Sequence, residues 1–296
     1  MKAIFIGMGG GYDILAAYML SQKYGYIDAD IGGMLNPKFI HYFDGGDGVY
    51  REERAINYVN GAKRYKRNIY GGYDLPERHF VDNDISKSIH NNVIDLSILK
   101  SDIRTIVHFL KSSYDKVIFC DVGGDVLFFG EKDFMVKTPI IDAYSLKIAD
   151  ELCKVKKKLA DVVVIGLGLD GELPYKNINT NINILNEKAG IININQLDNN
   201  DIKYLNNMYN QVKVDEEGKT INLLIDIGNN SFQNNYLIQK RNILDLKCWF
   251  GKVFVYEAGV LASLNPLTRV ETYESMISLA CNYGINLERY KLNGET

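Results

Sequence analysis

The sequence predicts an α/β protein, a Rossmann-like three-layer sandwich with a mainly parallel sheet and an irregular insertion. Short β-branched runs alternate with amphipathic helical patterns, as in βα units. Three of these runs end in glycine-rich turns that carry acids, and such turns gather on one edge of a parallel sheet. Hydrophobic residues make up 46% of the 296 residues and charged residues 24%, the balance of a globular protein. No linker-like segment divides the chain, so residues 1–296 are expected to form a single domain.

The first βα unit is the clearest in the chain. The run Ala3–Ile6 predicts a strand, and Tyr12–Tyr24 predicts the helix after it, because Ile14, Leu15 and Met19 share one helical face. The unit therefore starts the parallel sheet.

Residues 25–92 interrupt this rhythm. They are rich in glycine and tyrosine and show a helical period only at Arg51–Val59. Short strands are expected near Phe39–Phe43 and His79–Val81. A connection this long is uncommon without a functional or assembly role, so we expect residues 25–92 to be an insertion or excursion over the carboxyl edge of the strands, either a lid or a subunit contact.

The βα rhythm then returns. The predicted helices are Leu99–Lys111, Ile140–Lys154, Asp198–Asn210, Ser231–Gln239, Val260–Leu264 and Glu271–Tyr283. The predicted strands are Lys116–Cys120, Asp161–Ile165, Ile221–Asp226 and Val253–Tyr256. The asparagine-rich stretch Asn177–Ile184 is interpreted as a compositional bias and, because it is short, not as a disordered low-complexity tract.

The first glycine turn offers a phosphate site. Gly9, Gly10 and Gly11 let the backbone approach a ligand, and their N–H groups at a helix start favour an anion. Asp13 is counted with these ligand-binding residues, although an acid there also stabilises its own helix. The dinucleotide pattern G-x-G-x-x-G fails at Tyr12, which disfavours a dehydrogenase, and no Walker motif follows.

The second turn carries two carboxylates. Asp121 and Asp125 flank Gly123 and Gly124 at the end of a strand. Carboxylates in this position suit Mg²⁺, and Asp125 is also a candidate general base. Gly123 and Gly124 are candidate ligand-binding residues through their main chain. The alternative is that the whole segment is a tight turn without a ligand.

The third turn repeats the pattern. Gly168 and Gly171 are candidate ligand-binding residues, Asp170 is a candidate catalytic residue and Glu172 a candidate metal ligand. Pro174 is expected to keep a helix from starting normally, so that the turn crosses the sheet edge.

Glu257 ends the last predicted strand and is the third candidate catalytic residue, with Asp125 and Asp170. Its alternative role is that of an acid at a helix N-terminus.

Charge and cysteine content exclude several classes of protein. The formal net charge of -3 gives no basic field for nucleic acid, and no apolar run approaches the length that spans a bilayer. The four cysteines form no C-x-x-C pair, which indicates reduced thiols in a cytoplasmic protein.

Taken as a set, the turns Gly9–Asp13, Asp121–Asp125 and Gly168–Leu173, with Ile141-Asp142-Ala143, resemble a largely archaeal family of uncharacterised proteins, domain-of-unknown-function family 1152. The resemblance covers nearly the whole chain. It implies an α/β fold and no established activity, so it assigns no catalytic residues.

The strand ends together predict a protein that binds a phosphorylated metabolite or nucleotide. Mg²⁺ is the candidate cofactor, and the protein is either a Mg²⁺-dependent enzyme or a non-enzymatic, oligomeric ligand-binding or sensor protein. A homo-oligomer is left open, and no nucleic acid or membrane partner is expected.

Overall fold

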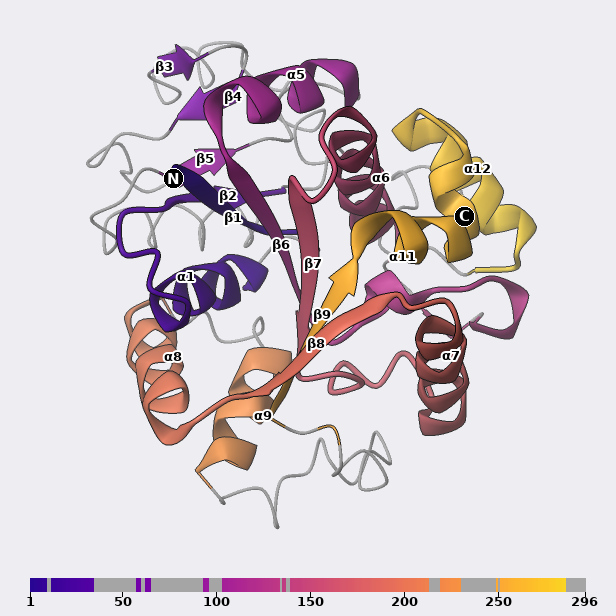
Figure 1. Cartoon of the computed structure of the whole chain (residues 1–296). Helices are drawn as coiled ribbons and strands as arrows, with labels where there is room; N and C mark the ends of the chain where they lie inside the picture. Colours follow the sequence, from indigo (N-terminus) through magenta and orange to yellow (C-terminus); the bar gives the residue numbers. More distant parts are fainter. Residues whose placement is uncertain are drawn as a thin grey trace, which may run out of the picture.

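The protein is an α/β fold built on one mixed sheet (Figure 1). The computed structural model describes residues 1–9, 12–34, 57–59, 62–64, 93–95, 103–133, 135–136, 139–212, 219–229, 249 and 251–285. Within this part of the chain, nine strands lie in the order β3-β4-β5-β2-β1-β6-β7-β9-β8.

The strands are β1 (Ala3–Gly7), β2 (Asp30–Gly33), β3 (Asn57–Val59), β4 (Ala62–Arg64), β5 (Val93–Asp95), β6 (Lys116–Val122), β7 (Ala160–Ile165), β8 (Ile191–Gln196) and β9 (Lys252–Glu257). The helices are α1 (Asp13–Lys23), α5 (Ile103–Ser113), α6 (Pro139–Val155), α7 (Tyr175–Glu187), α8 (Asn199–Val212), α9 (Lys219–Gly228), α11 (Ala258–Leu264) and α12 (Tyr273–Asn282). Short 3-10 helices are η2 (Asp125–Leu127), η3 (Glu131–Asp133) and η6 (Pro266–Arg269).

The middle of the sheet is parallel and buried. Strands β5, β2, β1, β6 and β7 run in one direction, with Phe5 beside Ile118 and Phe119 beside Val162. Phe5, Phe119 and Val162 are fully buried. Strands covered on both faces are near-continuous apolar runs, which is why β1, β6 and β7 were predictable as strands, whereas the short β2 and β5 were not predicted.

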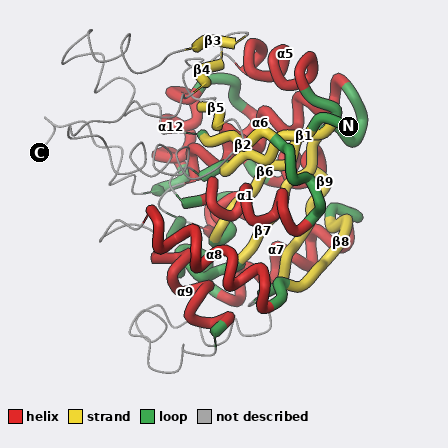
Figure 2. The backbone as a smooth tube through the Cα atoms, turned by 90° about the vertical axis from the view of Figure 1, so that its left-hand side faces the viewer, coloured by secondary structure: helices red, strands yellow, loops and turns green. Residues whose placement is uncertain are grey.

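Helices cover both faces of this sheet. α1 lies with α8 and α9 on one face, and α6 lies with α5, α11 and α12 on the other (Figure 1). In Figure 2, α1 and α8 stand in front of the strands. The chain passes from β1 through α1 to β2 and from β6 through α6 to β7, in opposite directions along the sheet. The neighbouring strands β1 and β6 therefore flank a topological switch point, where open α/β sheets bind ligands.

The expectation of a mainly parallel sheet is wrong outside this central part. β9 pairs antiparallel with β7, and β8 pairs antiparallel with β9. At the other end β3, β4 and β5 are joined by antiparallel pairs. The direction of a strand follows from the connection that leads to it, and the residues of the strand do not encode it.

Two segments form a different element from the one expected. The predicted strand Ile221–Asp226 is part of helix α9, in which Ile221, Leu224 and Ile225 are buried. A short apolar run fits either a strand or one turn of a buried helix, and periodicity alone does not separate them. The helical period at Arg51–Val59 is likewise wrong at its end, because Asn57–Val59 form β3.

The asparagine-rich stretch, for which no element was predicted, is part of the regular helix α7. α7 buries Ile178, Ile182 and Leu185 on one face, at helical spacing. Pro174 lies immediately before it as the N-cap residue, where a missing N–H group is tolerated. The expectation that Pro174 opposes a helix here is therefore wrong.

Within residues 25–92, strands β2, β3 and β4 join the sheet. The expected strands near Phe39–Phe43 and His79–Val81 lie outside the described residues, as does the predicted helix Ser231–Gln239. The excursion over the carboxyl edge stays a prediction. Within the described ranges, no helix has the length and apolar character needed to cross a membrane.

Candidate functional site

The three glycine turns lie in a row along the carboxyl edge of β1, β6 and β7. The Met8 N–H donates to the Cys120 carbonyl at 2.9 Å, which fixes the first turn to the end of β6. The Gly123 N–H donates to the Ile165 carbonyl at 3.1 Å, and the Gly168 N–H donates to the Gly123 carbonyl at 2.5 Å. These main-chain bonds bring the acids of all three turns to the same edge.

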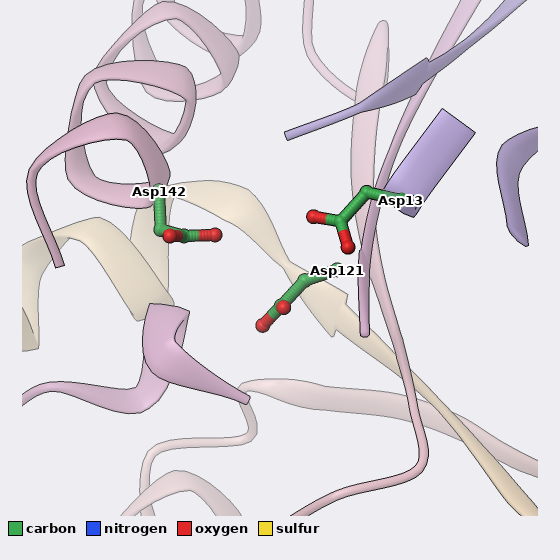
Figure 3. A group of neighbouring side chains, drawn as sticks. All are labelled: Asp13, Asp121 and Asp142. Carbon is green, nitrogen blue, oxygen red and sulfur yellow. The ribbon is translucent and has the colours of Figure 1, made fainter. Parts of the chain in front are cut away.

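Three buried carboxylates meet at the switch point. Asp13 begins α1, Asp121 lies near the end of β6 and Asp142 lies in the first turn of α6. Their exposed fractions are 8%, 2% and 3%, and one oxygen from each lies within 4.8 Å of the others. Figure 3 shows Asp13 and Asp142 pointing toward each other, with Asp121 beside the space between them. We call these residues the acid triad.

Local contacts hold the triad in place. The Gly9 N–H donates to Asp13 Oδ2 at 2.7 Å, and the Ser145 hydroxyl on α6 donates to the Met8 carbonyl at 2.9 Å. A Cβ atom on Gly9 would lie 2.6 Å from Asp13 Oδ2 and 3.0 Å from Asp142 Oδ1. Only glycine lets the first turn approach both carboxylates so closely.

A second group of acids lies beside the triad. Asp125 begins η2, while Asp170 and Glu172 lie in the turn after β7, where Asp170 Oδ1 accepts the Glu172 N–H at 2.8 Å. Gly123 has a φ of +123°, and a Cβ there would lie 3.0 Å from Asp170 Cγ and closer still to Oδ2. The second turn therefore packs its backbone directly against the Asp170 carboxylate.

The acids raise one another's pKa values. Burial, and then the negative charge of Asp170, raise the pKa of Asp121 to about 7, although N–H groups of Val126 and Gly124 at 3.4 Å act in the opposite direction. Burial raises the pKa of Asp125 well above its usual range, followed by the charges of Glu172, Asp170, Asp142 and Asp121. The two groups of acids therefore repel one another electrostatically. A bound cation would reduce this repulsion.

The other glycines predicted to bind ligand differ in their surroundings. Gly124 has a φ of +109°, and a Cβ there would lie 2.5 Å from Leu167 Cδ1, so its glycine is required by packing inside the protein. Gly168 and Gly171 both have positive φ in the turn after β7. Gly10 and Gly11 lie outside the described residues, so the phosphate cradle of the first turn stays a prediction.

Glu257 does not join the other acids, which corrects its expected place. It lies opposite Asp161, at the start of β7, because β9 runs antiparallel to β7. Its end of the strand is therefore at the opposite edge of the sheet from the triad. Its side chain instead accepts the Val260 N–H at 2.6 Å and caps α11.

Asp142 is the residue that sequence reasoning did not select as a site residue. It follows no glycine turn and stands at the start of a helix, so it looked like an ordinary acid of a first turn. The available signal was its place in Ile141-Asp142-Ala143, one of the segments that carry the family resemblance. In the structure it completes the triad.

Carboxylate oxygens converging from three elements provide ligands for a hard divalent cation such as Mg²⁺. Burial and the surrounding acids raise the pKa of Asp125, which favours its protonated form and makes it a candidate acid–base residue.

Comparison with known proteins gives a family and no activity. No curated protein and no solved structure matches the chain. A family model described as a protein of unknown function (DUF1152) matches residues 80–276, more than half of the chain and including Asp121, Asp125, Asp142, Asp170 and Glu172. The chain belongs to this family of proteins of unknown function, DUF1152.

Proposed function

We propose that the protein binds a phosphorylated metabolite or nucleotide together with Mg²⁺ at the carboxyl edge of β1, β6 and β7. The acid triad is the observation that supports this most directly. Mg²⁺ binds carboxylate oxygens at roughly 2.0–2.1 Å and usually keeps positions for waters and substrate phosphates. The triad also stands at the switch point of the sheet, where a ligand would have access to the N-terminal ends of α1 and α6.

The residues divide into three proposed roles: metal binding, acid–base catalysis and phosphate binding. Asp13, Asp121 and Asp142 would hold the metal. Asp125 and Glu172 would take part in the same or an adjacent cation shell, and Asp125 and Asp170 are the proposed acid–base residues. Gly9 to Gly11 would face the phosphate groups, since N–H groups at a helix start favour an anion.

The layered arrangement supports a finer assignment of the fold. Because α1 and α6 lie on opposite faces of a central parallel region, we propose a Rossmann-like three-layer sandwich formed by one domain. The cytoplasmic location expected from the cysteines stays a prediction.

Thermal unfolding with candidate ligands tests the function. We expect a nucleotide or phosphorylated metabolite to stabilise the protein in the presence of Mg²⁺ but not with EDTA. A ligand at about 100 times its dissociation constant adds roughly 2.7 kcal/mol to the free energy of unfolding. Product formation from the same compound, measured by phosphate release or chromatography, then separates an enzyme from a ligand-binding or sensor protein.

Two variants of α6 make the test specific. Asp142→Asn removes one carboxylate of the triad and should abolish the Mg²⁺-dependent shift. Asp150→Asn on the same helix removes a carboxylate that pairs with Lys154 at 2.7 Å and should leave the shift intact. An Asp142→Asn protein that is stabilised as much as the parent, or a parent that no phosphorylated compound stabilises, would contradict the proposal.

A further inference from the structure

The asparagine-rich helix α7 places two amide side chains against the short helices η2 and η3. Asn177 and Asn181 are four residues apart, so they lie on one face of α7. Asn181 is fully buried, where an amide needs hydrogen bonds to offset its loss of water. Its Nδ2 donates to the Leu127 carbonyl at 2.8 Å and to Asp133 Oδ2 at 3.2 Å, and its Oδ1 accepts from Lys132 Nζ at 2.6 Å. Asn181 therefore holds the last residues of both short helices.

Asp133 fixes where η2 ends. It is fully buried, and its Oδ2 accepts the Phe129 N–H at 2.7 Å. In a 3-10 helix each N–H donates to the carbonyl three residues back, so a longer η2 would need the Phe129 N–H to donate to the Val126 carbonyl. Asp133 accepts that N–H instead, and the Val126 carbonyl accepts from Asn265 Nδ2 at 3.5 Å. Buried side chains therefore terminate η2 after Leu127.

The other end of η2 belongs to the acid site. The Gly124 N–H donates to Asp121 Oδ1 and the Val126 N–H donates to Asp121 Oδ2, both at 3.4 Å. Asp125 is the first residue of η2. Because η2 is only three residues long, a shift of the end that Asn181 holds would move Asp125 and these N–H groups as well.

We propose that Asn181 is a positioning residue of the acid site. Through η2 it sets the place of Asp125 and of the two main-chain N–H groups that donate to Asp121. Asp133 supports this role, because it orients the Asn181 amide and ends η2. The asparagine-rich stretch would then serve the site without touching the ligand. The effect on ligand binding rests on the proposed function, whereas the placement of η2 does not.

Amide NMR signals of the metal-free protein test the placement of η2. Asn181→Ala removes the donor to the Leu127 carbonyl. We expect the Gly124 and Val126 amide resonances to shift and their hydrogens to exchange with solvent at least tenfold faster, relative to the rest of the protein. If Asn181→Ala does not fold, Asn181→Ser is used with the same expectation, because one O–H donor in place of two N–H donors cannot hold both short helices.

Asn177→Ala is the matched control. It lies on the same face of α7, but its Nδ2 donates to η3, to the Lys132 carbonyl at 2.7 Å and to Asp133 Oδ1 at 2.9 Å. Its loss should lower stability and leave the Gly124 and Val126 amide signals in place. A role of Asn181 in general stability alone would give the same result for both variants.

Calorimetric titration with Mg²⁺ tests the consequence for the site. We expect Asn181→Ala to bind Mg²⁺ at least tenfold more weakly, within the about 10–100-fold typical of residues that orient metal ligands, and Asn177→Ala to bind it as the parent does. Unmoved Gly124 and Val126 amides in the Asn181 variant, equal movement in both variants, or moved amides with unchanged Mg²⁺ affinity would overturn the proposal. Moved amides in a chain whose parent binds no Mg²⁺ would support the placement of η2 and contradict the proposed function instead.

Discussion

The parallel and the antiparallel parts of the sheet contain the same sequence pattern, an acid at the end of an apolar strand, but the acid has a different role in each. Asp121 and Glu257 each stand near the end of an apolar strand with small residues after them. Asp121 lies in the parallel part, where the ends of β1, β6 and β7 meet, and it joins the acid triad. Glu257 ends an antiparallel strand, so the same pattern delivers it to the opposite edge.

The environments of the two residues differ accordingly. Asp121 is almost fully buried, and burial, followed by the negative charge of Asp170, raises its pKa to about 7. Glu257 is half-buried and its carboxylate caps a helix. Strand direction, rather than the motif itself, decides whether a strand-end acid becomes a candidate ligand or a structural cap.

The largest expected effect is a pH dependence of the metal-free protein. The pKa of Asp121 is raised to about 7 and that of Asp125 well above its usual range, while an unfolded aspartate titrates near about 3.9. The folded protein therefore binds more protons than the unfolded one between about pH 4 and pH 7. Stability present below about pH 4 is lost as the pH rises through about 7, on the order of a few kcal/mol.

Urea unfolding with EDTA at about pH 5 and about pH 8 checks this dependence. Mg²⁺ should restore stability at the higher pH, because it replaces the protons that the acids have lost. A metal-free protein that is equally stable at both pH values would show that the acids of the parallel edge are not electrostatically strained.

The next largest effect is a loss of stability on replacing a glycine, and it should differ between the parallel and the antiparallel part of the sheet. Gly123→Ala forces a side chain into positive φ and against Asp170, and should lower the free energy of unfolding by about 2–3 kcal/mol. Gly251→Ala also has a positive φ, +74°, but its Cβ would meet chiefly the end of the Gln196 side chain, 2.7 Å away and able to move. We expect a loss of about 1 kcal/mol there. Equal losses would remove the distinction between the two turns.

The substitution Asp121→Asn should separate binding from stability. We expect metal affinity, measured by calorimetric titration with Mg²⁺, to fall at least tenfold, since even outer-shell partners of metal ligands contribute about 10–100-fold. The metal-free protein should become more stable at neutral pH, because one of several repelling charges is gone. Unchanged affinity together with lower stability would make Asp121 a structural residue only.

The smallest expected effect is a loss of stability on removing the helix cap that Glu257 forms at the end of the antiparallel strand β9. Glu257→Ala removes the acceptor of the Val260 N–H and should cost about 1 kcal/mol of stability. Metal affinity should stay as in the parent, because Glu257 lies at the opposite edge. Loss of metal binding in this variant would show that the two edges are coupled.

Much of the central fold was predictable from local pattern. β1, α1, β6, α6 and β7 were each found within a few residues of their ends, because buried apolar strands and amphipathic helices have distinct periods. Asp13 and Asp121 were selected as candidates because they belong to the glycine-rich turns that follow β1 and β6. The local pattern of Ile221–Asp226 was ambiguous, and only the packing around α9 decides its form.

The remaining information lies in relations between distant segments. The approach of Asp142 to Asp13 depends on the path of the chain from β6 to α6, which returns the helix to the edge where α1 begins. The place of Glu257 depends on the reversal of β9, which no residue of that strand encodes. The positions of Asp142 and Glu257 therefore follow from the topology of the chain. Composition and residue spacing in a single sequence do not predict them.

Crystals soaked with Mn²⁺ in place of Mg²⁺ would test the central claim most directly, by anomalous difference density. The account predicts a peak bounded by the carboxylates of Asp13, Asp121 and Asp142, and no peak at Glu257. The absence of a peak at the triad, at a Mn²⁺ concentration that stabilises the protein in solution, would contradict it.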